Sequence, residues 1–410
     1  MTHRQRRFGA HRVVAVLLTV LGLLAGAALV GAAPAGAVQR GTALARGVGY
    51  WQYDLQGAQG TVHAHVLSVD LRAARAGLLY PGKVAARATV SAMADTQGAV
   101  AGVNGDFFNI SEAQHPGVEA TGAAVGPAIA EGRVLKSAVP DGQRFGPALP
   151  PGATTRDVFG VGVDGRARLD RLSLAGSVRT PTERLPLGGL NQYALPVDSI
   201  GAFTSDWGEA SRVRATCGTD TDRAAGCSTD TSEVTVRRGR VVSVADRPGG
   251  GAIAAGTTVL VGREAGAREL RTFVVGERVA VTHRLVAAGS GVPYRFALGG
   301  YPVLRGGVPV AGLDDRTSAV RTAVGTADGG RRLLLFALDG APAYRSGLTL
   351  AEVASALRAA GAVDAFSLDG GGSTTLVARE PGAAGVSVRN HPTDAPERAV
   401  AGGIGVFARP

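Results

Sequence analysis

The segment AFSLDGGGSTT, residues 365–375, carries a carboxylate from an apolar strand into a loop of three glycines and three hydroxyls. Glycine lets the backbone turn through positive φ and bring successive N–H groups close to an anion, and hydroxyls add further donors. The segment therefore predicts a phosphate site beside Asp369. A tight turn with a solvated aspartate is the alternative, and the rest of the chain has to decide between the two.

A strand followed by a carboxylate occurs twice more in the chain. The predicted strand 99–103 leads into the loop Asn104-Gly105-Asp106-Phe107-Phe108-Asn109. The predicted strand 331–338 ends in Asp339-Gly340, and its unbroken apolar run predicts burial on both faces. The residues 62–69 alternate in the manner of a further strand.

Two helices are predicted beside these strands. One starts near Thr89 and ends at Gly98. The second begins with a capping box formed by Thr349 and Glu352, ends at Gly361, and precedes a strand at 362–368.

Residues 157–288 have a different sequence pattern from the segments on either side. They contain short β-type segments at 233–236, 241–244, 257–261 and 278–285, separated by Gly, Pro and Asp. We predict an antiparallel β-rich insertion here. The expected fold class is α+β, a mixed β-sheet core with a few packing helices. The insertion divides its domain into an N-terminal part, 38–156, and a C-terminal part, 289–410, which carries the glycine loop.

The N-terminus is typical of an export signal. Four arginines, Arg4, Arg6, Arg7 and Arg12, precede an apolar segment at 13–30 and a small-residue site at 35–37. We predict a signal peptide at 1–37, by the general or the twin-arginine route, and a secreted protein, extracellular or at the cell envelope. A membrane anchor is the competing interpretation. Cys217 and Cys227 lie close together in a polar segment, which in an exported protein predicts a disulfide.

The formal charge of +10 falls to +6 when residues 1–37 are removed. Lys83 and Lys136 are the two lysines, so nearly all positive charge is arginine in a chain rich in Ala and Gly, as in GC-rich actinobacterial genomes. Basic residues do not alternate with aromatic ones in a stripe, which argues against nucleic acid as a partner. Phosphorylated glycans and wall polymers remain compatible with the charge.

An ordered series of motifs resembles the phosphodiester glycosidases, relatives of the lysosomal uncovering enzyme. The motifs are Ala101–Asn109, Leu298–Leu304, Arg321–Gly325, Leu338–Gly340, Ser346–Leu350, Leu368–Thr374, Asn390–Pro392 and Glu397–Arg398. They cover most of the chain after residue 62, and the insertion is their least diagnostic part. Family members often carry an arginine directly after the Asp-Gly that corresponds to Asp339-Gly340, where this chain has Ala341-Pro342, so Arg345 or Arg316 would have to replace it.

The resemblance implies a hydrolase that releases a sugar from a sugar-1-phosphodiester. Such a reaction needs cations and amides near the departing phosphate and a carboxylate near the anomeric carbon. The expected catalytic acids are Asp369 first, then Asp339 and Asp106. The expected substrate or phosphate contacts are Asn104, Arg321, Gly370, Gly371, Gly372, Ser373, Thr374, Asn390 and Arg398.

Each expected contact also has a structural alternative. Asp106 and Asn104 could hold a loop, Arg321 could pair with Asp314 or Asp315, and Arg398 could pair with Glu397. His391 is expected to be exposed.

Two other functions fit the same residues. If Asp106, Asp339 and Asp369 converge on Mg²⁺, Ca²⁺ or Mn²⁺, the protein is a metal-dependent phosphodiesterase or phosphatase; the glycosidase needs no cofactor. Alternatively, an exported β-rich protein with arginine-lined loops binds exopolysaccharide without turnover. The sequence leaves open the sugar, its partner group, the stereochemical course and the oligomeric state.

Overall fold

The computed structural model describes residues 41–409, and the predicted signal peptide at 1–37 lies outside this range. The described residues form mainly β-sheet. Their three α-helices are α1 (Val90–Gln97), α2 (Ala265–Leu270) and α3 (Leu350–Ala359). The expected α+β class therefore fits only coarsely, because sheets dominate the fold. In this range, no helix combines the length and the apolar character needed to cross a membrane.

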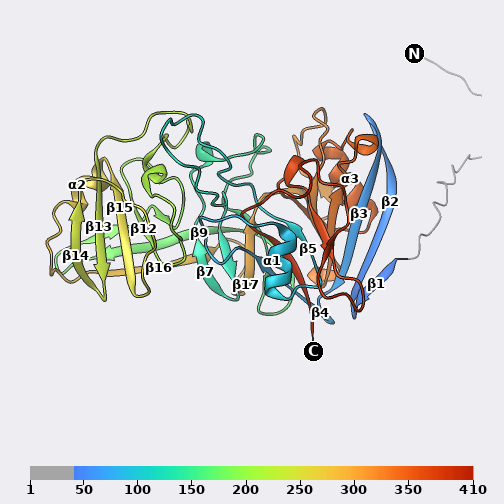
Figure 1. Ribbon diagram of the computed structural model, residues 1–410, viewed down its shortest axis with the longest axis horizontal. Coiled ribbons are helices and arrows are strands. Elements are labelled where there is room, and N and C mark those ends of the chain that lie inside the picture. Colours follow the sequence, from blue (N-terminus) through green and yellow to red (C-terminus); the bar gives the residue numbers. More distant parts are fainter. Residues whose placement is uncertain (1–40, 410) are drawn as a thin grey trace, which may run out of the picture. The chain divides into compact units, whose positions relative to one another are not determined.

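The central sheet has eight strands. Their spatial order is β1 (Thr42–Ala45), β2 (Val48–Gly57), β3 (Gly60–Asp70), β21 (Arg332–Leu338), β20 (Thr322–Ala327), β22 (Asp364–Ser367), β18 (Tyr301–Arg305) and β19 (Val308–Pro309). It joins segments from both ends of the chain, because β3 pairs with β21 from Asp70↔Arg332 to Ala64↔Leu338. In Figure 1 the blue strands β2 and β3 lie at the right, next to the orange C-terminal segments.

A second sheet, of five strands, packs against the central one. Its order is β24 (Ser387–Val388), β23 (Leu376–Ala378), β5 (Ala101–Asn104), β25 (Gly403–Ala408) and β4 (Ala74–Leu79). Alternate residues of β21 enter two different cores: Leu334 and Phe336 join the cluster with α3, and Leu333 and Leu335 join the cluster with β5 and β25. The predicted burial of this strand on both faces is thus confirmed.

A seven-stranded sheet follows along the molecule. It contains β10 (Arg184–Pro186), β9 (Ala167–Arg179), β8 (Asp157–Gly162), β17 (Tyr294–Gly299), β6 (Ala128–Ala130) and β7 (Arg133–Lys136), with β16 (Ala280–Ala287) paired to β9. The long strands β9 and β16, both within the insertion, extend from this sheet towards the insertion's outer part, as Figure 1 shows in green and gold.

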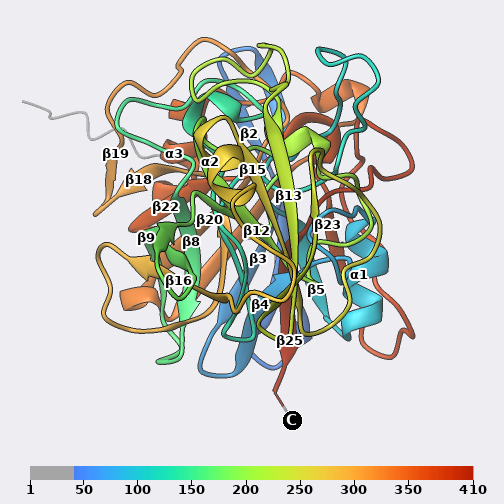
Figure 2. The same ribbon diagram turned by 90° about the vertical axis from the view of Figure 1, so that its left-hand side faces the viewer.

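The insertion ends in a sheet of its own. Its order is β11 (Gly189–Leu190), β12 (Ile200–Phe203), β15 (Thr257–Arg263), β13 (Thr231–Arg237) and β14 (Arg240–Ala245). Its pairings are antiparallel apart from β11 with β12, and it has a separate apolar core that includes Val234, Leu260 and Phe273. Figure 2 shows this sheet facing the viewer. The β-type segments predicted at 233–236, 241–244 and 257–261 lie in strands, the segment predicted at 278–285 begins two residues before β16, and α2 was not foreseen.

The local signals for helices and the cysteine pair are confirmed. Thr89 caps α1 by accepting a hydrogen bond from the Ala92 N–H (3.2 Å), and Gly98 ends the helix at φ 73°. Thr349 and Glu352 form the predicted capping box of α3. Cys217 and Cys227 form a disulfide within the insertion.

Candidate active site

Asp369 lies where the chain leaves β22 and meets the loop after β5. The Leu368 N–H still donates to the Thr322 carbonyl of β20 (2.9 Å), as a continuation of the sheet. The Asp369 N–H donates instead to the Gly105 carbonyl (2.8 Å). Two of the segments predicted to carry acids therefore meet at this residue.

The glycine loop turns tightly at Gly371 and lets a side chain approach at Gly372. Gly371 has a φ of 58°, a region that favours glycine. A Cβ on Gly372 would lie 2.2 Å from the Arg398 Nη2, so a larger residue would displace that guanidinium. The N–H groups of Gly371, Ser373 and Thr374 already donate to carbonyl groups within the protein. In this conformation the loop therefore offers a phosphate fewer amides than the sequence suggested.

Two buried asparagines hold the loop in place. The Asn104 Nδ2 donates to the Asp369 carbonyl (2.7 Å), while its Oδ1 accepts from the Thr322 Oγ1 (2.7 Å) and the Thr375 N–H (3.1 Å). The Asn390 Oδ1 accepts from the Leu376 N–H (2.8 Å), and its Nδ2 donates to the Thr374 carbonyl (2.9 Å). Both side chains are thus engaged inside the protein. They position the loop, as in the structural alternative considered for Asn104.

Asp369 lines a cleft of about 570 Å³. The lining comes from segments far apart in the sequence: Phe107, Gly146, Pro147, Ala148, Leu149, Pro150, Gly312, Asp314, Thr317, Ala319, Arg321, Leu350, Asp369, Gly370 and Gly371. Apolar groups predominate on the side of residues 146–150, and Asp369 and Arg321 supply polar ones. A polar site within an apolar wall is the usual composition of a small-molecule pocket.

Arg321 contributes a cation to this cleft. Its Nε donates to the Leu348 carbonyl (3.0 Å) and its Nη2 to the Thr317 carbonyl (2.7 Å), which fixes the guanidinium at the start of β20. Among the described residues no carboxylate lies within ion-pair distance of it, and Asp314 instead accepts the N–H groups of Arg316 and Thr317. The positive charge of Arg321 therefore remains available to an anion in the cleft.

The surroundings of Asp369 favour its protonated form. Burial raises the pKa of Asp369 from 3.8 to about 6, and the negative charge of Asp106 adds to this effect. A hydrogen bond from Ser373 and the positive charge of Arg398 act in the opposite direction. A carboxyl group with such a pKa can exchange a proton near neutral pH.

Asp106 lies behind Asp369 and lines a different, small cavity together with Lys136. The Gly126 N–H donates to its Oδ2 (2.6 Å), and a Cβ on Gly299 would lie 2.3 Å from the same oxygen. Burial raises the pKa of Asp106 and lowers that of Lys136, while each charge favours the ionised form of the other. Asp106 thus acts on Asp369 through its charge but does not line the cleft.

Arg144 is a charged neighbour that the sequence did not reveal. It is only 9% exposed, and its Cζ lies 4.3 Å from the ring centroid of Phe107 and 5.3 Å from that of Tyr301. Its positive charge acts on both Asp106 and Asp369, and its Nη2 has no hydrogen-bond partner among the described residues. An isolated arginine in an irregular segment has no periodicity or spacing by which sequence reasoning could find it.

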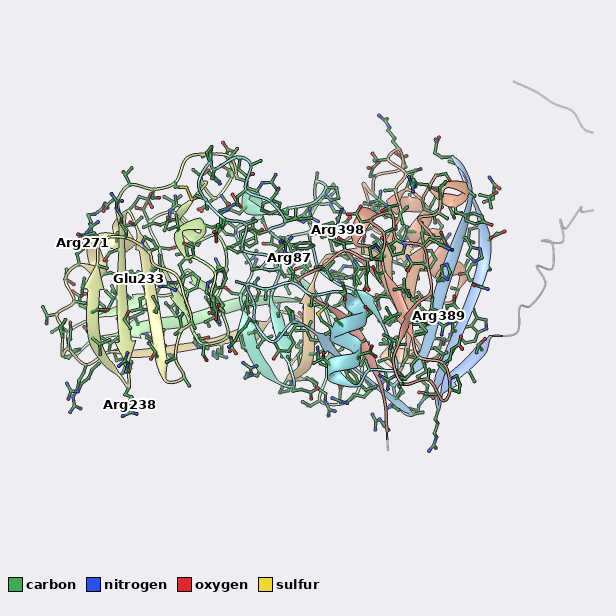
Figure 3. All side chains as sticks on the ribbon, in the orientation of Figure 1. Arg87, Glu233, Arg238, Arg271, Arg389 and Arg398 are labelled. Carbon is green, nitrogen blue, oxygen red and sulfur yellow. A yellow bond between two sulfur atoms is a disulfide. The ribbon has the colours of Figure 1, made fainter. Side chains whose placement is uncertain are left out.

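A hydrogen bond between Arg398 and Ser373 supports the glycine loop. The Arg398 Nε donates to the Asp394 Oδ2 (2.8 Å), and its Nη1 donates to the Ser373 Oγ (3.2 Å). Glu397 instead accepts hydrogen bonds from the N–H and Oγ of Ser91 at the start of α1 (3.0 and 2.6 Å). Figure 3 labels Arg398 close to the glycine-loop half of the molecule and remote from Arg271 and Glu233 of the insertion. Thr374, next to Ser373, is fully buried.

Asp339 lies outside the cleft, on the other face of the central sheet. It follows Leu335 and Ala337, whose side chains enter the core shared with β5 and β25. Its Oδ2 accepts hydrogen bonds from the His65 Nε2 (3.2 Å) and the His391 Nδ1 (2.8 Å). His391 is exposed, as expected, with 75% of its side-chain surface accessible. The structure therefore brings Asp369 and Arg321 together in one cleft, with Asp106 acting on Asp369 through its charge alone, and leaves Asp339 outside.

The two replacements considered for the absent family arginine do not line the cleft either. The Arg345 Nε donates to the Gly340 carbonyl (3.1 Å). Arg316 is almost fully exposed and lies 3.9 Å from the Asp315 carboxylate. The positive charges that act on Asp369 are those of Arg398 and Arg144, while Arg321 is the cation that lines the cleft with it.

Comparison with known proteins supports the predicted resemblance. Residues 230–407 match the family model described as phosphodiester glycosidase. The matched range includes Arg321, Asp369 and Arg398, while Asp106 and Arg144 precede it. No curated protein matches this chain.

Two solved structures share the fold. A hypothetical protein from Synechocystis superposes with a TM-score of 0.66 at 20% identity, over 88% of this chain and 62% of that one. This chain thus spans less than two thirds of that protein. A "putative exported protein" from Burkholderia pseudomallei K96243 gives 0.63 at 24% identity, over 86% and 76%. The catalytic domain of zebrafish N-acetylglucosamine-1-phosphodiester alpha-N-acetylglucosaminidase, auto-inhibited by its pro-peptide, gives 0.43 at 16%, over 88% and 83%.

Proposed function

We propose that this protein, whose residues 230–407 match the phosphodiester glycosidase family, hydrolyses the bond between a sugar and a phosphodiester group. Water adds to the anomeric carbon, the C1–O bond breaks, and the departing oxygen leaves as part of a phosphomonoester. The observation that carries this proposal is the Asp369 carboxyl, with a pKa of about 6, in one cleft with the Arg321 guanidinium.

The two groups supply what the reaction requires. A phosphate is a good leaving group, so charge stabilisation on its oxygens matters more than a strong acid, and Arg321 provides a fixed positive charge. The oxocarbenium-like centre of the sugar needs a carboxylate that stabilises it, attacks it or activates water. Asp369 takes this role in its ionised form.

The neighbouring residues tune and hold these two groups. Asp106 raises the pKa of Asp369 by its charge, and Ser373 lowers it through a hydrogen bond. Asn104 and Asn390 position the loop from both sides. Phe107 and the proline, alanine and leucine side chains of residues 147–150 form the apolar wall against which a sugar ring can lie.

The proposed substrate is a wall polymer or extracellular glycan. This part of the proposal follows from the predicted export signal at 1–37, because an exported enzyme meets phosphodiester-linked sugars in the cell envelope. Teichoic acid decorations, capsular phosphoglycans and scavenged glycans are the candidate sources of such a substrate.

A screen of aryl and glycosyl phosphodiesters tests the reaction, with released sugar and released phosphate measured separately. The expected products are free, unphosphorylated sugar and a phosphomonoester. The Asp369→Asn variant should lose turnover, whereas Asp315→Asn, an exposed carboxylate outside the cleft, should retain it. Sugar phosphate as the product would show that a P–O bond is cut instead. Binding of a phosphoglycan without turnover in the parent protein would favour the non-catalytic alternative.

Chelation tests the metal-dependent alternative, which requires Asp106, Asp339 and Asp369 to share one site. In residues 41–409 no group of three or more His, Cys, Asp or Glu side chains is arranged to hold a metal ion, and Asp339 faces away from the cleft. We expect turnover to persist in EDTA. Loss of turnover that Mg²⁺, Ca²⁺ or Mn²⁺ restores would contradict the proposed mechanism.

A further inference from the structure

A second polar pocket, of about 370 Å³, lies at the other end of the central sheet. Five of its lining residues are arginines and one is an acid: Arg72, Arg75, Arg295, Arg331, Arg409 and Asp164. Guanidinium groups repel one another, so their convergence requires compensation by nearby carboxylates, by water or by a bound anion.

The carboxylates near this pocket are already paired. Asp70 lies 3.6 Å from Arg72, Glu131 lies 2.5 Å from Arg75, and Asp164 lies 2.5 Å from Arg168 outside the lining. The remaining charges are those of Arg295, Arg331 and Arg409. Among the described residues none of these three lies within ion-pair distance of a carboxylate; Arg409 donates to the carbonyls of Leu71 (3.0 Å) and Ala74 (3.3 Å).

The sheets fix the three unpaired arginines at one place. Arg295 lies within β17, between the buried residues Tyr294 and Phe296. Arg331 directly precedes β21, and its carbonyl accepts a hydrogen bond from the Leu71 N–H (2.8 Å). Arg409 directly follows β25. Because Arg295 lies within a strand and the other two directly flank strands, the sheets set the backbone positions of all three cations.

This pocket is separate from the cleft. The strand β21 begins next to Arg331 and ends at Leu338, whose N–H donates to the carbonyl of Arg321. At about 3.3 Å per residue, the strand places the two sites roughly 20 Å apart.

We propose that this arginine pocket binds a phosphate or sulfate group, carried by a glycan or free in solution. The guanidinium fork matches the geometry of such oxyanions, and Arg295, Arg331 and Arg409 supply a net positive charge for them. The proposal does not depend on the hydrolase activity, because none of these residues lines the cleft.

Equilibrium dialysis with radiolabelled inorganic phosphate at low ionic strength tests the pocket. An Arg321→Gln background removes the cation of the cleft, so that the pocket dominates binding. Adding Arg295→Gln and Arg331→Gln should weaken binding by roughly tenfold or more, since two charge-assisted contacts are lost. The matched control adds Arg284→Gln and Arg358→Gln, two exposed arginines outside both sites, and should bind like the background. The proposal would be overturned if the Arg321→Gln background bound no phosphate. It would also be overturned if the variant with Arg295→Gln and Arg331→Gln bound phosphate as tightly as the control variant.

A second pair of substitutions keeps the test valid if loss of charge affects folding. Arg295→Lys with Arg331→Lys preserves both charges but loses the two planar guanidinium forks, so it should bind phosphate more tightly than the Gln pair and more weakly than the background, because the electrostatic attraction remains. Binding as weak as in the Gln pair would contradict that attraction. Phosphate should raise the Tm of the background but not that of the Gln pair, since it stabilises only a fold that binds it. Sulfate and glucose 6-phosphate, with glucose as the neutral control, then show whether the free ion or the ester is preferred.

Discussion

Two segments of the chain have the same local sequence and opposite environments. Leu338-Asp339-Gly340 and Leu368-Asp369-Gly370 both follow a buried strand of the central sheet. Asp339 accepts hydrogen bonds from two histidines and the Ala341 N–H (2.7 Å). Asp369 instead faces a cleft and has the charge of Asp106 behind it.

The environments shift the two acids in opposite directions. Burial opposes ionisation of Asp339, but hydrogen bonds from His391, Ala341 and His65 outweigh it and lower its pKa. For Asp369, burial prevails and raises the pKa to about 6. An Asp-Gly after a strand therefore predicts where a carboxyl lies, while its partners decide whether it stabilises the fold or serves chemistry.

The largest expected difference between the two acids is in catalytic activity when each aspartate is replaced in turn by asparagine. Asp369→Asn is expected to lower kcat/KM by roughly 10³-fold, because a positioned acid–base or nucleophilic group is lost. Asp339→Asn should leave kcat/KM of the folded protein within about threefold of the parent, because this residue does not line the cleft. Steady-state kinetics on a glycosyl phosphodiester measures both. Equal losses of activity in folded protein would show that the distinction between the two acids is false.

Asp339→Asn should destabilise the fold more than Asp369→Asn does, which is the opposite of their order in loss of activity. Asp339→Asn is expected to lower the free energy of unfolding by about 2 kcal/mol, because hydrogen bonds to a charged, buried group are lost. Asp369→Asn should leave it unchanged or increase it, since the ionised form of that buried carboxyl is disfavoured in the fold. Urea unfolding at pH 7 measures both. Asp54→Asn, which removes an exposed partner of His63, is the control, with an expected change below about 1 kcal/mol. A larger loss in Asp369→Asn than in Asp339→Asn would refute the comparison.

Much of the fold follows from local signals in the sequence. The caps at Thr89 and Thr349, the strands of the insertion and the double burial of β21 each depend on neighbours close in sequence, and all appear in the structure. The dominance of sheet over helix does not follow in this way. Strand order depends on pairing between distant segments, such as β3 with β21, and no local pattern specifies the partner.

The site was predictable to a smaller extent. The glycine loop and Arg321 stood out by residue type and order, and they do meet in one cleft. Burial could not be predicted: Thr374 is enclosed, Asn104 and Asn390 are saturated with internal hydrogen bonds, and three loop amides are committed to carbonyls. Such engagement is a property of the tertiary structure. A sequence shows only that donors and acceptors exist.

The pH dependence of activity and of stability should separate the two acids further. If Asp369 acts as a carboxylate, kcat/KM should rise with pH through a value near 6, the pKa of Asp369. Because the folded pKa of Asp369 is raised, its contribution to stability declines as pH rises from 3.8 through 6. The lowered pKa of Asp339 has the opposite consequence: its contribution is present above 3.8 and is lost as pH falls through its folded pKa. A pH–rate profile without an ascending limb between about 5 and 7 would exclude an essential carboxylate of this kind.

The smallest expected effect concerns Ser373, which connects Arg398 to Asp369. Its hydrogen bond stabilises the ionised carboxylate, so Ser373→Ala should raise the pKa of Asp369 and move the ascending limb of the pH–rate profile to higher pH by up to about one unit. The kcat on the plateau should change little, because the carboxylate itself remains. Thr374→Val is the matched control: it removes a neighbouring buried hydroxyl that has no hydrogen-bond partner among the described residues, and it should leave the limb in place. An equal shift in both variants would mean that packing of the loop, and not the Ser373 hydroxyl, sets the ionisation of Asp369. A limb that stays in place in Ser373→Ala would show that Arg398 and Ser373 support the loop without tuning its acid.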